Sequence, residues 1–330
     1  MMGVKLMMKS KPKIVTLDMG TFSAKLVEGT DCDDGTLDVK KYGIYSSLRM
    51  NIQDGTFINK VDYAKQLKQI RKEHFSHITH CYCCFTCLSI YTKNFILPKM
   101  KQNELLMNIE LELPSFLPEP VKQFQYDFKI FDEYDTVDQK SYHINVYALP
   151  KQLVLDCQWV LQQAGFKGKA IDIMPNICEK LYRRLALVKL RDEACIAMID
   201  AGYSMVSVTL LENGKLKLYR SIPQGMGADN ENTSLKDQWT SILHDIQRIF
   251  EYYSAYVSLS GKKPDCIYII GFGALQPDFI NLLQVSLNCR VESLEKILKS
   301  DAVNIQLTSS TDLPLLFHSL GLLIREDHDR

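Results

Sequence analysis

The 330-residue sequence has no excess of either charge, because its 39 lysines and arginines are matched by 39 aspartates and glutamates. This balance does not favour nucleic acid or anionic lipid as a main partner. Long apolar runs are absent too: the most apolar late stretch, Leu313–Ile324, contains His318 and is about half as long as the ~20 residues that span a membrane. The start, Met1–Lys13, lacks the apolar core of a secretory signal, and the charged end, Arg325–Arg330, is unlike a membrane anchor. We therefore expect a soluble protein.

A disulfide framework is not expected either, although the chain has ten cysteines. Most of them lie inside apolar strand or helix patterns, which is typical of buried thiols in the reducing cytoplasm. One short stretch does crowd six residues of types that bind zinc: His77, His80, Cys81, Cys83, Cys84 and Cys87. Successive strand side chains point to opposite faces, however, and no glycine or proline makes a knuckle that would let them converge. Buried strand cysteines are the better interpretation.

The stretch Lys13–Lys25 joins an apolar run to an acid and a glycine turn. Asp18 closes the expected strand, and Gly20 lets the backbone approach a ligand without a side chain in the way. Thr21 and Ser23 offer hydroxyls and amides to phosphate oxygens, and Lys25 would supply positive charge. Because no helix start follows, this is not the loop of P-loop or Rossmann proteins. Alone, the pattern is also that of a plain β-hairpin.

The same plan returns half a chain later, in Ile196–Val208. There Asp200, Gly202 and Ser204 stand where Asp18 and its turn stood in the first copy. Two such hairpins indicate a duplicated architecture.

A third stretch, Cys266–Asp278, predicts a buried strand, a Gly-x-Gly-Ala turn and a helix start. Gly271, Gly273 and Ala274 would then hold a nucleoside against bare backbone. In this order the three stretches resemble the two phosphate hairpins and the adenosine loop of the actin-like ATPase superfamily.

Between the two hairpins the pattern changes from a compact α/β unit to an insertion. A strand over Leu37–Tyr45 and a helix over Val61–Ile70 complete the first unit. A second strand ends at Pro98, a helix covers Asn103–Leu113 before a group of prolines, and an alternating hairpin leads to Pro150.

This order resembles the PilM family, the cytoplasmic actin-like component of type IV pilus assembly, which is related to the division protein FtsA. The likeness covers nearly the whole chain. The stretches that carry it are Leu97–Pro98, Glu110–Pro114, Leu149–Pro150, Gln163–Asp172, Ile222–Gly225, Ile246–Tyr253, the Gly271 loop and Leu316–Arg325.

The resemblance implies an α/β, actin-like two-domain fold made of duplicated RNase H-like subdomains. The first domain would span 11–188, with an FtsA/PilM-type subdomain inserted at about 76–150. The second would span 189–312 with a much reduced lid subdomain, and 313–330 would return as a helix to the first domain.

Two departures from the family pattern bear on nucleotide chemistry. The helical lid that closes over adenine in the family is essentially missing, since only Met226–Gln238 separates the Ile222–Gly225 turn from the next matching helix. The family also places a glutamate for metal-bound water in the crossing segment, where this chain has Met174. A thioether is only a weak acceptor and does not bind magnesium.

The residues and the resemblance together leave two main functions open. In the first, an active ATPase, Asp18 and Asp200 hold magnesium and water, ATP with magnesium is the cofactor, and domain closure couples nucleotide state to pilus assembly. In the second, which we favour, the chain is a cytoplasmic scaffold with weakened nucleotide binding and little or no hydrolysis. A sugar kinase is a weaker third reading, because no separate catalytic aspartate lies beside a sugar-sized insertion.

The resemblance also implies a partner: the N-terminal cytoplasmic tail of a PilN-like membrane protein, which would keep the chain peripheral to the membrane. Other pilus assembly proteins and self-association remain open, whereas nucleic acid is not expected. The expected peptide surface is on the helix Asn103–Leu113 and its proline-rich exit, at Leu106, Glu110, Glu112 and Pro114. The alternative is that the leucines of this helix simply pack inside the insertion.

Overall fold

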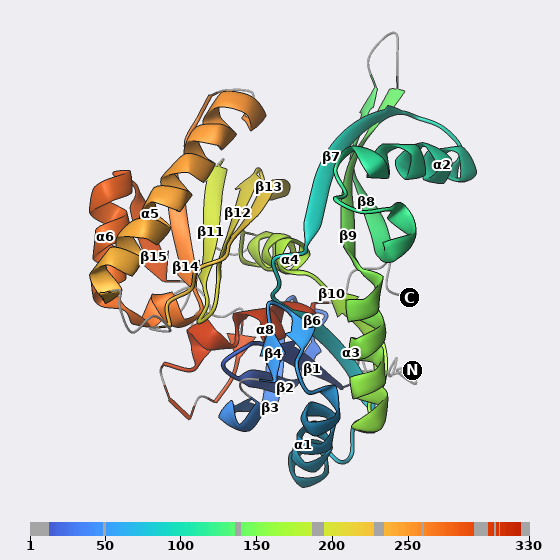
Figure 1. Cartoon of the computed structure of the whole chain (residues 1–330), viewed down its shortest axis with the longest axis vertical. Helices are drawn as coiled ribbons and strands as arrows, with labels where there is room; N and C mark the ends of the chain where they lie inside the picture. The colour runs from blue at the N-terminus through green and yellow to red at the C-terminus, as the bar shows by residue number, and fades with distance from the viewer. Residues whose placement is uncertain are drawn as a thin grey trace, which may run out of the picture.

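The computed structural model describes residues 13–48, 51–135, 140–186, 195–227, 234–258, 261–293, 303–306, 308–309 and 311–324. Two larger sheets are built mainly from the first and the second half of the chain, and a smaller three-stranded sheet lies apart from both. In Figure 1 the first sheet is at the bottom, the second at upper left and the three-stranded sheet at upper right. No helix in the described part of the chain is long and apolar enough to cross a lipid bilayer.

The first sheet has six strands in the order β10-β6-β1-β2-β3-β16. Its centre is β1, which runs antiparallel to β2 and parallel to β6. Helices α1 and α3 pack against each other on this unit, and β4 and β5 form a small separate hairpin. The bounds are β1 Ile14–Met19, β2 Ala24–Asp31, β3 Leu37–Tyr45, β4 Ile52–Gln53, β5 Thr56–Phe57, α1 Lys60–His74, β6 His80–Phe85, α3 Lys151–Gln163, β10 Lys167–Asp172 and β16 Val303–Asn304.

The second sheet repeats the central plan of the first. It has the order β13-β12-β11-β14-β15, and β11 again runs antiparallel to the next strand, β12, and parallel to a later one, β14. This matches the duplication that the two Asp-Gly turns predict. Helices α5 and α6 pack on it. The bounds are β11 Cys195–Ala201, β12 Val206–Glu212, β13 Lys215–Ile222, α5 Leu235–Tyr252, β14 Cys266–Ile270, α6 Pro277–Leu287 and β15 Arg290–Ser293.

The three-stranded sheet has the order β7-β9-β8 and carries one helix, α2. Leu105, Ile109 and Leu113 recur at helical spacing and pack into a separate apolar core with this sheet. The bounds are β7 Tyr91–Pro98, α2 Gln102–Glu112, β8 Phe124–Asp135 and β9 Lys140–Pro150. The expected start of the insertion, about residue 76, falls before β6, which pairs with β1 in the first sheet. The separate sheet begins only at Tyr91.

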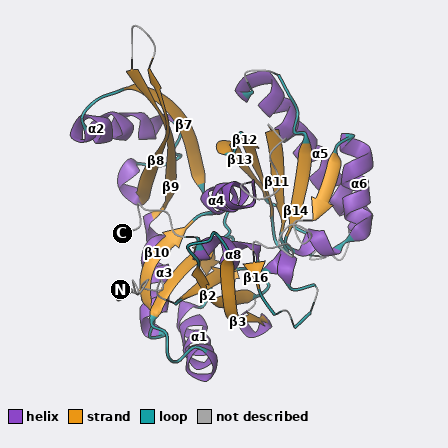
Figure 2. Ribbon diagram, turned by 180° about the vertical axis from the view of Figure 1, so that it is seen from behind, coloured by secondary structure: helices purple, strands orange, loops and turns teal. Residues whose placement is uncertain are grey.

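Two helices join these units. Helix α4 (Met174–Ala186) lies between the two larger sheets in both Figure 1 and Figure 2 and contacts β12 and β13. Helix α8 (Phe317–Leu323) is buried along its whole length and contacts β1, β2, β6 and α4. Residues 188 and 189, where the halves are expected to meet, lie outside the described residues, so the numerical domain bounds remain predictions.

The cysteine-rich stretch is a core strand. Cys81, Cys83 and Cys84 lie in β6, Cys87 follows it, and all four side chains are buried. All ten cysteines are free thiols. The buried-strand interpretation of this stretch is therefore correct.

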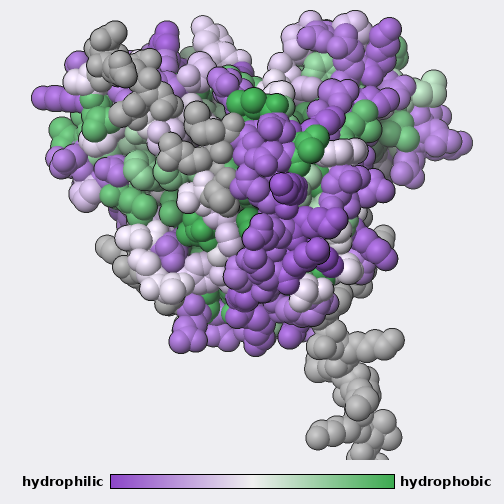
Figure 3. Space-filling model, turned by 60° about the horizontal axis from the view of Figure 1, so that its bottom comes forward, coloured by the Kyte–Doolittle hydropathy of each residue, from purple (hydrophilic) through white to green (hydrophobic). Residues whose placement is uncertain are grey.

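The molecular surface is mixed in character. On the face shown in Figure 3, hydrophilic residues form a broad band, and hydrophobic residues appear in smaller separate patches. A notch at the top of this view separates two lobes.

Candidate functional site

The two predicted aspartates lie at equivalent places, near the ends of β1 and β11. Asp18 pairs across its hairpin with Lys25, and Asp200 pairs with Ser207. Both carboxylates are buried, with 1% and 4% of their residue surfaces exposed. The fold therefore brings the strand ends of the two halves together at a buried junction, which we call the cleft.

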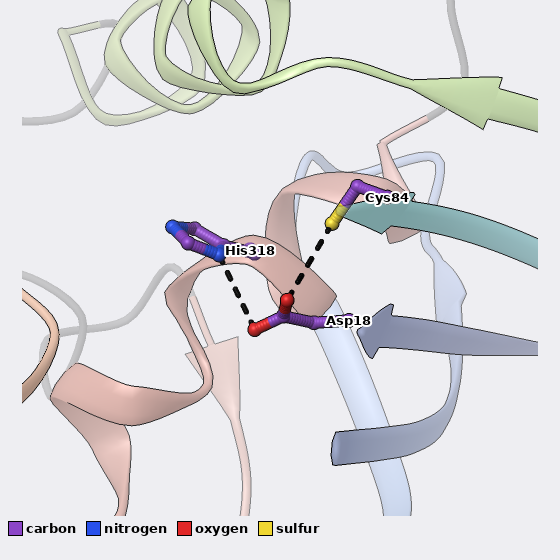
Figure 4. A group of neighbouring side chains, drawn as sticks. All are labelled: Asp18, Cys84 and His318. Carbon is purple, nitrogen blue, oxygen red and sulfur yellow. Dashed lines mark hydrogen bonds and ion pairs between the residues drawn. The ribbon is translucent and has the colours of Figure 1, made fainter. Parts of the chain in front are cut away.

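A histidine from the end of the chain joins these two carboxylates. In Figure 4, His318 reaches from α8 toward Asp18. Its Nδ1 lies 3.2 Å from Oδ2 of Asp18, and its Nε2 lies 3.4 Å from Oδ2 of Asp200. Burial alone would lower the pKa of His318, but the two carboxylates raise it to about 9. The imidazole is thus a cation at neutral pH.

Asp18 has a second positive partner. The Nζ of Lys25 lies 3.1 Å from Oδ2 of Asp18, the same oxygen that faces His318. Burial would raise the pKa of Asp18, but Lys25 and His318 together lower it to about 2. The Sγ of Cys84 lies 4.0 Å from Oδ1, the other carboxylate oxygen. Burial and the Asp18 charge raise the pKa of this thiol, so Cys84 remains protonated.

The tips of the two hairpins touch each other. The Oγ of Ser204 donates a hydrogen bond to Oγ1 of Thr21 across 3.0 Å. Beside it, the rings of Phe22 and Tyr203 stack with centroids 4.5 Å apart. The hydroxyls that the sequence offers to phosphate are therefore used in a contact between the halves, while Ser23 is buried in the first turn.

The glycines of the expected site are required by the packing of the chain itself. A Cβ at Gly20 would lie 2.9 Å from Nζ of Lys25, and one at Gly202 would lie 2.9 Å from the carbonyl oxygen of Met205. At Gly271, which has a φ of +74°, a Cβ would lie 2.5 Å from Oδ1 of Asp200. Gly273 is buried, and a Cβ there would lie 2.3 Å from Cβ of Ala201.

The turn around Gly271 and Ala274 also uses its own backbone groups. The Gly271 amide donates to the carbonyl of Pro314, and the Ala274 amide donates to the carbonyl of Gly271. The expected nucleoside loop is thus packed against the segment that leads into α8.

Magnesium nucleotide does not fit this arrangement of residues. His318 and Lys25 already neutralise the carboxylates that would hold the metal, and the hairpin tips are in direct contact. Met174 is buried at the start of α4 and offers no oxygen to a metal-bound water. Only 12 residues, 223–234, separate β13, which ends at Ile222, from α5, which begins at Leu235; the reduced lid subdomain itself stays a prediction.

The expected peptide surface lies on α2, away from the cleft. Leu106 is half-buried, while Glu110, Glu112 and Pro114 are exposed. Glu110 accepts a 2.6 Å hydrogen bond from the hydroxyl of Tyr126 on β8. Residues advance by about 100° around a helix, so Glu110 and Glu112 point to nearly opposite sides. The four predicted residues therefore do not form a single face.

Three functional candidates were not found by sequence reasoning. Met107 and Leu111 lie on the open side of α2 with 63% and 77% of their surfaces exposed. His318 stands in the sequence as a polar residue within the apolar run Leu313–Ile324. A signal for it did exist, because an ionisable residue in a segment apolar enough to be fully buried needs a charged partner.

The raised pKa of His318 predicts that the protein becomes less stable in mild alkali. Below pH 6.5 the histidine is protonated in both folded and unfolded chains, so its contribution to the stability of the folded protein is fully present. From pH 6.5 to about 9 the folded chain alone keeps the proton, and this contribution is lost as pH rises. Urea unfolding should show a loss of up to about 1.4 kcal/mol per pH unit, which His318→Gln should abolish. A slope that persists in this variant would assign the effect to another group.

Comparisons with known proteins identify a family and a fold. The model of a family described as type IV pilus assembly protein PilM matches residues 16–243. A solved PilM–PilN type IV pilus biogenesis complex contains a chain with a TM-score of 0.79 and 18% identity, over 94% of this chain and 98% of that one. The ethanolamine utilization protein EutJ from Carboxydothermus hydrogenoformans gives a TM-score of 0.50 at 13% identity, over 95% of this chain and 89% of that one. The expected actin-like α/β fold is confirmed at this level.

Proposed function

The chain belongs to the PilM family of type IV pilus assembly proteins, and from this premise we propose that it is a scaffold of that machinery. It recruits the N-terminal cytoplasmic tail of a PilN-like membrane protein and so works at the cytoplasmic face of the membrane. The similar solved structure is a complex of PilM with PilN, which supports the choice of partner. Nucleotide binding is weak and hydrolysis is little or none.

The observation that carries this proposal is an apolar stripe on the open side of α2. Met107 and Leu111 are four residues apart and therefore lie above one another on the helix. Leu106 and Glu110 lie at the border between this stripe and the side that packs on the sheet. Exposed apolar side chains that gather on one helix face mark binding sites more often than singly scattered ones do.

The charge beside the stripe suits a tail with a basic or free N-terminal end. Glu104 falls on the same side of α2 as Leu111, and Glu110 lies on the opposite border. An extended peptide would bury a few apolar anchors on the stripe and place positive charge near these acids. We expect an affinity of about 1 μM, which corresponds to about 8 kcal/mol.

Peptide binding to α2 variants tests the partner surface. A labelled peptide from the N-terminus of the cognate PilN-like protein should bind the full chain in fluorescence anisotropy. The double variant Met107→Ser, Leu111→Ser should weaken binding by about tenfold or more, because each lost apolar contact is worth about 1.5–3 kcal/mol when fully buried. Val285→Ser provides the matched control, since Val285 is an equally exposed apolar residue on α6. An equal loss of affinity in the double variant and in Val285→Ser, or no loss in either, would reject α2 as the binding site.

The competing ATPase function makes a different prediction. Turnover of Mg-ATP by the wild-type protein should equal that of Asp200→Ala, because His318 and Lys25 already occupy the carboxylates that would hold the metal, and Met174 offers no oxygen to a metal-bound water. Release of phosphate, followed at saturating Mg-ATP, measures both. A wild-type rate well above that of the variant would favour the ATPase.

A further inference from the structure

His318 is held in the cleft by the rigid packing of α8. All seven residues of this helix are buried, and Gly321 packs so closely on α4 that a Cβ there would lie 2.6 Å from Cγ2 of Ile177. The hydroxyl of Thr16 on β1 donates 2.8 Å to the carbonyl of Ser319, the residue after His318. The hydroxyl of Ser319 donates to the carbonyl of Lys25. The imidazole is therefore fixed in position by both strands of the first hairpin.

The surroundings of the ring favour a positive charge on it. A carboxylate oxygen faces each ring nitrogen, on Asp18 from the first half and on Asp200 from the second. Two carboxylates within ion-pair distance of one buried ring favour the imidazole that carries a proton on each nitrogen, because this form alone is attracted to both. Lys25 on β2 and Cys84 on β6 also contact Asp18.

The charges in this cluster already cancel. Two carboxylates, Asp18 and Asp200, are opposed by two cations, Lys25 and His318. A divalent ion added to this set would leave two uncompensated positive charges among buried groups. It would also compete with Lys25 and His318 for the same oxygen of Asp18.

A metal site made by Asp18, Cys84 and His318 is the main alternative. Their ligand atoms lie within 4.8 Å of one another. Such a site would need the Nδ1 of His318 without a proton and Cys84 as a thiolate. Lys25 beside Asp18 disfavours an added cation, and the burial of Cys84 disfavours its thiolate. The geometry therefore favours a histidine cation over a bound metal.

We infer that His318 replaces the divalent cation in this cleft, joining the two strand-end aspartates so that the halves stay closed without a nucleotide. The contacts of Thr21 with Ser204 and of Phe22 with Tyr203 complete the closed state. The hydrogen bond that the Gly271 amide donates to the carbonyl of Pro314, on the segment that leads into α8, adds a third link. This internal cation belongs to the cleft and is independent of the partner surface on α2.

Manganese binding provides the test, because Mn²⁺ resembles Mg²⁺ in its preference for oxygen ligands and can be followed directly. Titrating the full chain with Mn²⁺ and measuring free Mn²⁺ by electron paramagnetic resonance should show no cleft binding in the wild type. His318→Gln keeps a polar side chain of similar size but removes the charge. We expect His318→Gln to bind one Mn²⁺ per chain at least about tenfold more tightly than the wild type. Adding Asp200→Asn to this variant should remove the gain.

The exposed residue His244 supplies the control: His244→Gln should behave as the wild type does. A folded His318→Gln protein that gains no Mn²⁺ binding would contradict the inference. If that variant does not fold, nuclear magnetic resonance of the wild type decides. Mn²⁺ should leave the ring signals of His318 sharp, and their broadening by stoichiometric Mn²⁺ would show that the cleft takes a metal after all.

Discussion

Replacing Asp18 with asparagine is expected to destabilise the folded protein by about 3–5 kcal/mol. The change keeps the shape of the side chain but removes the carboxylate that faces both Lys25 and His318. Two cations then remain in a buried cluster with Asp200 as their only carboxylate among the contacts described. Breaking a buried charge cluster by removing one partner costs more than the net worth of the pair, because the partners stay desolvated.

Urea unfolding of the full chain measures this effect. Asp34→Asn is the matched control, because Asp34 is an exposed aspartate that bonds only to the nearby Thr36 in the contacts described, and it should change stability far less. In the double variant Asp18→Asn, His318→Gln, one unpaired cation is gone. Its destabilisation should fall short of the sum of the single variants by roughly 1 kcal/mol or more. Asp18→Asn protein as stable as Asp34→Asn protein would mean that the cluster contributes little.

The repeated hairpins could be predicted from sequence because their signal is local. In each copy an apolar run ends in an acid and a glycine within a few residues, and this places Asp18 and Asp200 at strand ends. The core side of α2 was predictable for the same reason, since Leu105, Ile109 and Leu113 recur at helical spacing. Local patterns thus located both the strand ends and the helix that carries the proposed partner surface.

Local patterns could not predict that His318 lies between the two aspartates or that the two hairpin turns contact each other. His318 is 300 residues from Asp18, and only the packing of α8 on β1 brings them together. The contact between Thr21 and Ser204 likewise depends on how the two halves meet. A phosphate-binding turn and a turn that closes on its counterpart have the same local sequence, so glycines and hydroxyls alone did not distinguish them.

The residue at which the insertion begins also depends on contacts that the local sequence does not reveal. The apolar strand β6 precedes the insertion directly, and nothing in its residues tells which sheet it joins. Its partners, β1 and β10, lie far from it in the chain. Helix periodicity alone would also put Val61 on the buried side of α1 with Ala64 and Leu67, but Val61 is largely exposed and Tyr63 takes its place in the core.

The insertion is tied to the rest of the molecule by polar contacts, and one of them is buried. Glu179 of α4 is 1% exposed, and its Oε1 lies 3.6 Å from Nζ of Lys129 on β8 and 3.4 Å from Nη2 of Arg183. On β7, the side-chain Nδ2 of Asn94 donates to the backbone carbonyls of Leu216 and Lys217 on β13. The sheet that carries α2 is thus fastened to both the crossing helix and the second half.

Replacing Glu179 with glutamine should therefore loosen the insertion. We expect a loss of about 3 kcal/mol in stability, near the lower end for a broken buried pair because Arg183 is partly exposed and stays hydrated. Hydrogen exchange should rise in α4 and β7 and stay unchanged in β1, since β1 is held by its own sheet. Adding Lys129→Met should restore part of the stability, because the lysine no longer lacks its carboxylate. Glu251→Gln, at an exposed position on α5, is the control, and an equal response from both glutamates would show that the link from Lys129 to Glu179 does not hold the insertion in place.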